Sequence, residues 1–347
     1  MENNNIMKSN KNCCLICFGE SVIIDDSFPG YIKNTWFKIN FCTECGCSFV
    51  LPKLDNISEL YNLIYTHSKK LSGYRRYEKY RQIIKFSPFP RIESLASIED
   101  CYWGLLQAIR SQEKNVEKKA DLKILEIGSG LGYTTYALRK SGYDVLGYDI
   151  SSTAVQSATK DFGPYYSAVP FERLKDQYSN GFDIIFLTEV IEHISEPVAF
   201  IDSLQALLKK DGCMIVTTPN RLTSTDDEIW SVTEPPIHYW WFSPKSIDTL
   251  AKRIGLNAKY VDFRPIGKAF PPKTFYGQSL PGGALNEDGS VAHDYFDHKS
   301  IFDIKDYAII IAKMILRRKK ASMHPAKLLK SNDCPLWGTT LCAVLKR

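Results

Sequence analysis

The chain has 347 residues, of which 44% are hydrophobic and 24% charged, a composition typical of globular proteins. The length exceeds that of a typical single domain, so we expect one main domain with smaller attachments. The N-terminus shows no apolar stretch behind its charges, and the longest apolar run, Tyr307–Leu316, is interrupted by Lys313 and too short to cross a bilayer. These features argue against the secreted and membrane-spanning classes and predict a cytoplasmic protein.

The formal net charge of +5 is unevenly spread along the chain. Residues 264–337 hold twelve Lys or Arg and seven Asp or Glu, an excess equal to that of the whole chain. We therefore expect any anionic partner to meet this segment.

Cysteines cluster near the N-terminus. Four of them form two C-x-x-C pairs separated by 24 residues: Cys14, Cys17, Cys42 and Cys45. This spacing predicts a zinc ribbon over residues 1–52, in which four thiolates hold a structural ion and leave it no open position. Cys13 and Cys47 could each replace a neighbour, so the choices between Cys13 and Cys14 and between Cys45 and Cys47 stay open. The alternative is a small core of reduced cysteines.

Residues 53–119 have a helical pattern, with tyrosines and leucines at helical spacing and a proline-rich break at 87–90. We interpret this segment as a helical linker or cap that joins the ribbon to the main domain. An alternative is that Tyr74, Tyr77 and Tyr80 line a substrate entrance.

From Leu122 the sequence alternates strands and helices. The predicted elements are Lys123–Ile127, Tyr133–Ser141, Asp144–Asp149, Ser152–Asp161, Asp183–Thr188, Pro197–Lys209 and Cys213–Thr218, beginning and ending with a strand. This order predicts an α/β fold with a doubly wound, mostly parallel, Rossmann-like sheet whose ligand lies at the carboxyl ends of the strands. Two later strands, Ala258–Phe263 and an antiparallel Thr339–Leu345, would complete the sheet, which we expect to have seven strands when one more strand before Val169 is counted.

A glycine-rich turn follows the first of these strands, with glycines at 128, 130 and 132. Glycines let a backbone approach a nucleotide-like ligand closely, and the turn leads into a helix N-terminus. Tyr133 stands where the dinucleotide fingerprint requires glycine, which argues against NAD. Asp149 ends the second strand, where a carboxylate can accept hydrogen bonds from ribose hydroxyls. Together these features predict a nucleoside cofactor.

Over residues 120–263 the chain resembles the class I S-adenosylmethionine-dependent methyltransferases. The resemblance rests on the glycine turn, on Asp149, and on residues 182–194 and 218–220. The resemblance implies that the turn holds the methionine end of S-adenosylmethionine and that Asp149 holds the ribose. The cofactor-binding residues that it implies are Glu126, Gly128, Ser129, Gly130, Gly132, Asp149, Ile150, Val169 and Thr188. The sequence departs from the family near adenine, where Ser167-Ala168 replaces an acidic residue often found before position 169.

The ribbon resembles one attached to bacterial methyltransferases of sugar and cell-surface polysaccharide pathways, and His238–Pro244 (HYWWFSP) matches a motif of those enzymes. This second resemblance implies O-methylation, or less readily C-methylation, of a sugar, nucleotide-sugar or glycan intermediate by in-line transfer. The alternatives are an RNA methyltransferase of the 2′-O type and, in another class, a non-catalytic zinc-ribbon adaptor that keeps the fold.

Methyl transfer to oxygen requires removal of a proton, and the candidates are His193, His238 and Glu189. If residues 188–194 form a helical turn, Glu189, Glu192 and His193 share one face. With His238, they resemble the metal site of terminal 2′-O-methyltransferases of small RNAs and partly that of ubiquinone-pathway O-methyltransferases. That resemblance implies a second site, for Mg²⁺ or another divalent ion.

The alternative for these four residues is structural. Glu189 and His193 would hydrogen-bond locally, and His238 would pack against the neighbouring tryptophans. We favour this alternative at the level of sequence, because E-x-x-E-H occurs in many methyltransferases that need no metal.

The segment 264–336 is too long for a simple loop between two neighbouring strands. We therefore predict that it forms a lid on the acceptor side of the site, and that the final strand of the sheet lies in 337–347. Ile304–Leu316 has a helical pattern and leads into a basic run, so Ile304–Lys320 could contact an anionic membrane surface or a lipid-linked glycan. It could equally neutralise a nucleotide-sugar diphosphate or an RNA backbone, while the simplest interpretation is a lid helix with a solvated basic end.

Overall fold

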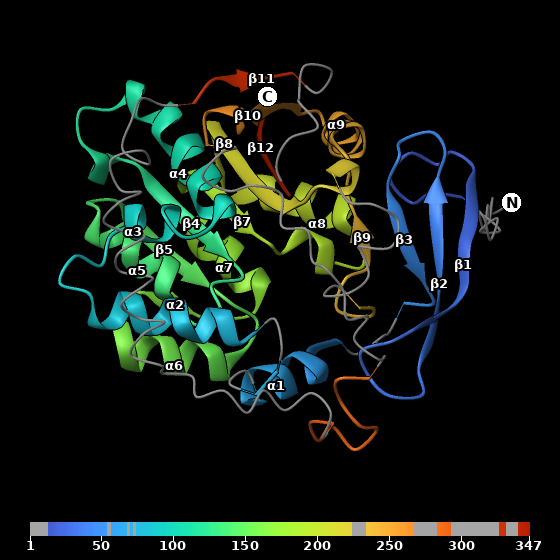
Figure 1. Ribbon diagram of the computed structural model, residues 1–347. Helices are drawn as coiled ribbons and strands as arrows, with labels where there is room; N and C mark the ends of the chain where they lie inside the picture. The colour runs from blue at the N-terminus through green and yellow to red at the C-terminus, as the bar shows by residue number, and fades with distance from the viewer. Residues whose placement is uncertain are drawn as a thin grey trace, which may run out of the picture.

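The computed structural model describes residues 13–53, 57–67, 70–71, 74–223, 234–266, 283–292, 326–330 and 339–347. These residues build a large sheet with helices on both faces and a smaller sheet at one end of the molecule (Figure 1).

The large sheet has eight strands among the described residues, in the order β11-β10-β12-β8-β7-β4-β5-β6. Their bounds are β4 Lys123–Ile127, β5 Asp144–Tyr148, β6 Tyr166–Ser167, β7 Phe182–Thr188, β8 Leu208–Pro219, β10 Asn257–Val261, β11 Leu328–Leu329 and β12 Thr340–Lys346. Strands β4 to β8 pair in parallel, whereas β12 is antiparallel to both β8 and β10. The expected α/β sheet with an antiparallel last strand is confirmed. Its predicted seven strands become eight because of β11, which lies inside the segment predicted as a lid.

The α-helices of the described residues are α1 Ile57–His67, α2 Arg75–Phe86, α3 Ile92–Ala96, α4 Asp100–Gln112, α5 Tyr133–Lys140, α6 Ser152–Phe162, α7 Phe171–Tyr178, α8 Pro197–Leu204 and α9 Pro244–Arg253. The predicted helix Pro197–Lys209 is too long, because the chain leaves α8 through a 3₁₀ turn at Gln205–Leu207 and Leu208 already pairs with Phe182 of β7. The sequence pattern gave no bounds for β6 and did not predict α7.

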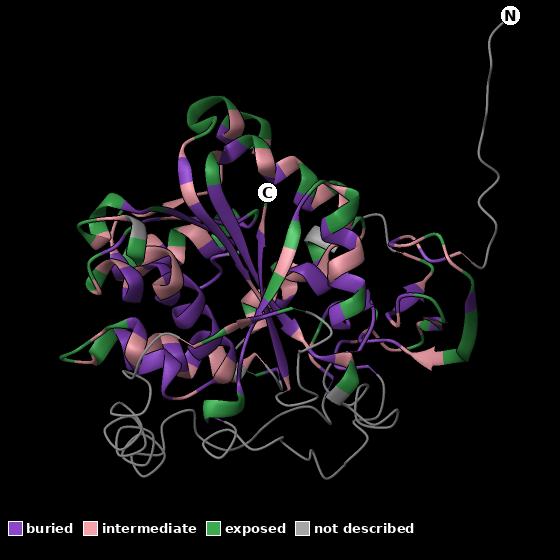
Figure 2. Cartoon of the chain, turned by 90° about the horizontal axis from the view of Figure 1, so that it is seen from above, coloured by how far each residue is buried: buried purple, intermediate pink, exposed green. Residues whose placement is uncertain are grey.

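The core lies on both faces of the large sheet, and β7 shows why. Ile184 and Phe186 pack in a cluster with α3, α4 and α5, whereas Ile185 and Leu187 pack in a second cluster with α8 and α9. A strand buried on both faces is a continuous apolar run, which explains the sequence of β7. The central strands are accordingly buried along most of their length (Figure 2).

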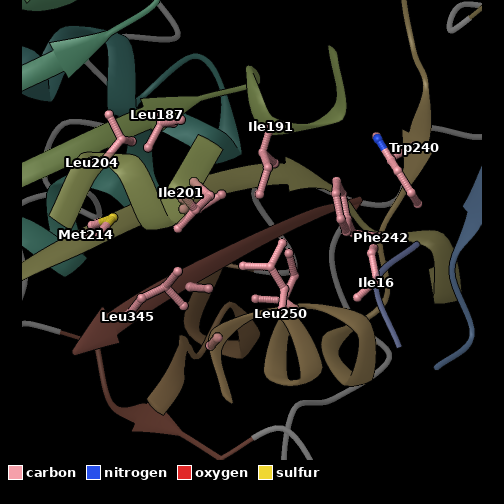
Figure 3. Close-up of a cluster of buried hydrophobic side chains, with 14 of the residues drawn as sticks. Ile16, Leu187, Ile191, Ile201, Leu204, Met214, Trp240, Phe242, Leu250 and Leu345 are labelled. Carbon is pink, nitrogen blue, oxygen red and sulfur yellow. The ribbon is translucent and has the colours of Figure 1, made fainter. Parts of the chain in front are cut away.

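The smaller sheet contains β1 Ser21–Pro29, β2 Trp36–Cys42, β3 Ser48–Leu51 and β9 Trp240–Trp241, all paired antiparallel. Its fourth strand therefore comes from the segment after β8, about 190 residues after β3. Ile16 of the N-terminal part shares one buried cluster with Phe242 and Leu250 of the main domain (Figure 3). The cysteine-bearing part and the main domain thus form a continuous core.

Of the segment predicted as a lid, residues 283–292 pack in a third cluster. There Leu285 lies with Tyr31, with Ile64 of α1 and with Ile237. The predicted helix Ile304–Leu316 and most of the basic run lie outside the described residues. Within the described part, no helix is long and apolar enough to span a membrane.

The two-faced core predicts the effect of truncating one isoleucine. Ile185→Ala removes a fully buried side chain and should lower the free energy of unfolding by about 2–5 kcal/mol. Ile24→Ala, at a position that is 45% exposed, should change it by less than about 0.5 kcal/mol. Urea denaturation of both variants checks this, and equal effects would contradict the assignment of the core.

Candidate active site

The glycine turn after β4 has a backbone that only glycine adopts easily. Gly128, Gly130 and Gly132 have φ values of 76°, 46° and 79°. A Cβ at Gly128 would lie 2.6 Å from Cγ2 of Val190, and one at Gly132 would lie 2.5 Å from Cβ of Ala158. The turn therefore brings bare backbone to the carboxyl end of β4, and Gly132 caps α5.

Asp149 fastens this turn to the end of β5. Its Oδ2 accepts a hydrogen bond of 2.7 Å from the amide of Gly130, and its Oδ1 accepts one of 2.8 Å from the amide of Ser151. Burial raises the pKa of Asp149, while these two amide bonds act in the opposite direction. A carboxylate has about four acceptor positions, so it retains capacity for two ribose hydroxyls.

The other predicted cofactor residues surround this turn. Glu126 is buried at the end of β4 and accepts a hydrogen bond from the Thr135 hydroxyl, and burial raises the pKa of Glu126 to about 8. Ile150 is 64% exposed beside Asp149, and Val169 is half-buried after the edge strand β6. An exposed apolar side chain next to a buried carboxylate suits a ligand with one polar and one apolar part.

The carboxyl end of β7 lacks the helical turn that would bring Glu189, Glu192 and His193 to one face. Only Ile191–His193 is 3₁₀, and Glu189 has φ +54°. This left-handed residue interrupts the turn, and Oε1 of Glu189 accepts a hydrogen bond of 3.0 Å from the Thr217 hydroxyl. The condition for a shared face is therefore not met at Glu189.

Glu192, His193 and His238 do converge, with ligand atoms within 4.8 Å of one another. The two imidazole rings are 4.6 Å apart and perpendicular, and Nε2 of His193 lies 3.9 Å from Oε1 of Glu192. Nδ1 of His193 lies 2.6 Å from the carbonyl oxygen of Ile237. Since a carbonyl only accepts, Nδ1 carries the proton and Nε2 keeps its lone pair.

Burial sets the protonation of this group. It lowers the pKa of His193 to about 4 and that of His238 well below its usual range. It raises the pKa of Glu192 well above the usual range, with the Glu189 carboxyl adding to the shift. For Glu189, burial raises the pKa to about 7 although the Arg76 guanidinium acts in the opposite direction.

Buried polar atoms without a hydrogen-bond partner gather at this edge of the sheet. In the part of the chain that the structure describes, they include side-chain atoms of Tyr61, Arg76, Ser129, Thr188, Glu192, Thr218 and His238. Buried polar groups in proteins are normally satisfied, so a concentration of unsatisfied ones marks a place built for a ligand. Ser129, Thr188 and Thr218 lie at the carboxyl ends of β4, β7 and β8, whereas Tyr61 and Arg76 come from α1 and α2.

Sequence reasoning missed the contribution of α1 and α2 to this edge. The Tyr65 hydroxyl lies 3.2 Å from where a Cβ on Gly130 would stand, and the Tyr61 ring meets His193 edge-on at 6.0 Å. Arg76 donates to Glu99 at 3.2 Å and to the Tyr77 hydroxyl at 2.8 Å. The i, i+4 spacing of the two α1 tyrosines was visible in the sequence, but not the surface that α1 covers.

The tyrosines at 74, 77 and 80, offered as a substrate entrance, form a series of edge-to-face contacts at 6.0 and 6.4 Å. Tyr80 continues this series into the core, against Tyr102 and Tyr133, and its hydroxyl donates to Glu99. Packing is therefore the role of Tyr80, whereas Tyr77 is half-buried and also contacts Arg76.

The N-terminal cysteines form a group of four thiols with the expected members, Cys14, Cys17, Cys42 and Cys45, all within 4.8 Å of one another. Sγ of Cys14 lies 3.7 Å from Sγ of Cys45, close to the roughly 3.8 Å that tetrahedral coordination at 2.3 Å per bond requires. Cys13 lies outside this group, and Cys47 is a further, buried thiol, 3.6 Å from Cys14. The donor set and spacing therefore fit a tetrahedral zinc ion.

Comparison with known proteins finds a match for the main domain. Residues 102–261 match a family model described as a methyltransferase domain, so this part of the chain is similar to such domains. The match begins inside α4 and ends with β10, somewhat earlier at its start than the range 120–263 expected from the sequence.

Curated proteins similar to this part of the chain have ubiquinone biosynthesis in their names. The human mitochondrial ubiquinone biosynthesis O-methyltransferase is 25% identical over 182 residues, 48% of this chain and 48% of that protein. The ubiquinone biosynthesis O-methyltransferase of Parvibaculum lavamentivorans is 30% identical over 149 residues, 41% of this chain and 55% of that protein. The chain thus spans about half the length of these relatives. None of those described here is a polysaccharide enzyme.

Among solved structures, the plantazolicin methyltransferase BamL covers 84% of this chain and 96% of its own, with 15% identity and a TM-score of 0.42. A methyltransferase from Archaeoglobus fulgidus covers 71% of this chain and 94% of its own, with 14% identity and a TM-score of 0.38.

The four-cysteine group predicts the metal content of the chain. The purified protein should hold about one zinc ion, and the double variant Cys14→Ser, Cys45→Ser should hold none because it loses two of four ligands. Cys13→Ser should retain the zinc, since Cys13 lies outside the group. Elemental analysis of the three proteins checks this, and a parent protein without zinc would refute the ribbon.

Proposed function

We propose that this chain is an S-adenosylmethionine-dependent methyltransferase that methylates an oxygen of a small organic acceptor. The observation that carries the proposal is the convergence of unsatisfied buried polar atoms around the glycine turn and Asp149, inside a methyltransferase domain. The names of the curated relatives support oxygen as the methylated atom.

The residues around the turn fit the methyl donor. The glycine backbone would hold its methionine part and Asp149 its ribose, while Ile150 and Val169 offer apolar surface to adenine. The unpartnered hydroxyls of Ser129 and Thr188 would complete the polar contacts. When bound, S-adenosylmethionine supplies a methyl group on a sulfonium, which needs alignment more than activation.

Glu189 is the residue best placed to take the acceptor proton. Its backbone amide donates to the Thr217 carbonyl at 3.1 Å and its carboxyl is held by the Thr217 hydroxyl, so its orientation is fixed. A general base works best when its pKa lies near the working pH, and that of Glu189 is about 7. His193 and His238 would then orient the acceptor on the neighbouring side.

We infer further that Glu192, His193 and His238 hold a divalent cation. The two oxygens of Glu192 and Nδ1 of His238 are buried without a hydrogen-bond partner, which a purely structural role leaves unexplained. Two imidazoles and one carboxylate suit Mn²⁺ or Fe²⁺ better than Mg²⁺, which prefers oxygen ligands. When bound, such an ion would polarise an acceptor oxygen.

The sugar, nucleotide-sugar or glycan acceptor expected from the sequence gains no support from the relatives described above. The expected membrane contact through Ile304–Lys320 falls on residues outside the described part. A small molecule with a hydroxyl group is therefore the acceptor class that we propose, in preference to RNA.

Binding of the methyl donor tests the central part of this proposal. Asp149→Asn should weaken S-adenosylhomocysteine binding at least about tenfold, because a charged hydrogen-bond acceptor is lost from the ribose site. The control is Asp144→Asn, at the other end of β5, where the side chain is 51% exposed and affinity should stay unchanged. Calorimetric titration measures the affinity of both variants for S-adenosylhomocysteine. A parent protein that does not bind this ligand would contradict the proposal that the chain is an enzyme.

A metal titration tests the divalent site separately. With zinc already in the cysteine group, the parent should bind about one Mn²⁺ ion, detected by electron paramagnetic resonance, and Glu192→Gln should lose it. Glu196→Gln, at an exposed position four residues on, should keep it. If the parent binds no Mn²⁺, the three side chains are structural.

A further inference from the structure

The segment 234–243, which we name the rim loop, carries His238 and connects the N-terminal sheet to the active site. Its strand β9 pairs with β3, with Ser48 opposite Trp241 and Phe49 opposite Trp240. The amide of Val50 donates to the carbonyl of Tyr239 at 3.0 Å. The backbone from the Tyr239 carbonyl to Trp241 is therefore part of the cysteine-bearing sheet.

The same loop holds the residues after β7. The amide of Tyr239 donates to the carbonyl of Glu192 at 2.8 Å, and Nε1 of Trp240 donates to the carbonyl of Ile194 at 2.9 Å. His193 in turn bonds to the carbonyl of Ile237. Three hydrogen bonds thus fix Glu192 and His193 relative to His238 through the rim loop.

Helix α9 follows the rim loop and touches both cysteine pairs, one at each end. At its N-terminus the Ser243 hydroxyl donates to the carbonyl of Cys45 at 2.8 Å. At its last residue Nη1 of Arg253 donates to the carbonyls of Leu15 and Ile16 at 2.7 and 2.6 Å, within the first C-x-x-C turn. The helix therefore bridges the two turns that a metal ion would join.

We propose that a metal ion in the four-cysteine group clamps α9 and the rim loop, and so positions His193 and His238 at the active site. Without the ion, no cross-link joins the thiols of the two cysteine turns, because all described cysteines are free thiols. The turns are then connected through weaker contacts, such as the hydrogen bond of 3.2 Å from the Thr43 amide to the Glu20 carbonyl, and the contacts at the two ends of α9 would be held together less firmly. This gives the N-terminal ribbon a positioning role for the methyltransferase domain.

Hydrogen–deuterium exchange on the full chain, with and without metal, tests this proposal without an acceptor and independently of methyl transfer. After a strong zinc chelator and a phosphine reductant, amides of 237–243 and 191–194 should exchange at least about tenfold faster, since local opening is no longer opposed by the clamp. Peptides from β4 and β5 should keep their protection, and S-adenosylhomocysteine affinity should change by less than about threefold.

Two results would overturn the proposal. One is a rim loop that keeps its protection while residues 14–50 exchange freely. The other is equal loss of protection in β4 and β5, because the metal would then support the whole fold rather than this loop.

A matched pair of variants tests the clamp with metal bound. Arg253→Met removes the bonds to the first cysteine turn at an exposed position, and Lys252→Met changes the adjacent exposed cation, which makes no comparable contact among the described residues. Because coupling between two sites is reciprocal, Arg253→Met should weaken zinc binding several-fold in a chelator competition and lower protection of the rim loop. Identical zinc affinity and exchange in the two variants would contradict the clamp.

Discussion

The hydrogen bond from the Gly130 amide to the buried Asp149 carboxylate ties the turn after β4 to the end of β5. It needs a turn without side chains, and it needs a carboxylate where β5 leaves the sheet. Both requirements are met at the centre of the sheet, next to the point where the strand order reverses between β4 and β7. The remaining parts of the site are arranged around this fixed pair.

Buried acidity is the second constraint on the site. Glu126, Asp149, Glu189 and Glu192 lie at one edge of the sheet, and burial raises the pKa of each. The cation that acts on Glu189 and Glu192 is Arg76, held by Glu99 and Tyr77. A positively charged ligand would lower the cost of ionising these carboxyl groups, and both a sulfonium and a divalent ion have that charge. The electrostatics therefore agree with the proposed methyl donor and with a cation at the three converging side chains.

Much of this arrangement follows from sequence periodicity and spacing. The alternation of strands and helices, the glycine turn, Asp149 and the four cysteines are local patterns, so they could be located before the fold was known. Three features were not local. Glu189 has a left-handed backbone, Tyr65 of α1 covers the glycine turn, and Trp240 and Trp241 add a strand to the N-terminal sheet. Each is accompanied by contacts between segments far apart in the chain, such as the hydrogen bond from Thr217 to Glu189, which neither helical nor strand periodicity reports.

The most direct test of the account is a crystal structure of the chain with S-adenosylhomocysteine. The account predicts ribose hydroxyls within hydrogen-bond distance of Asp149, the amino-acid part along the glycine turn, and the sulfur directed toward Glu189 and the rim loop. A ribose held away from Asp149, or a ligand elsewhere on the molecule, would contradict it.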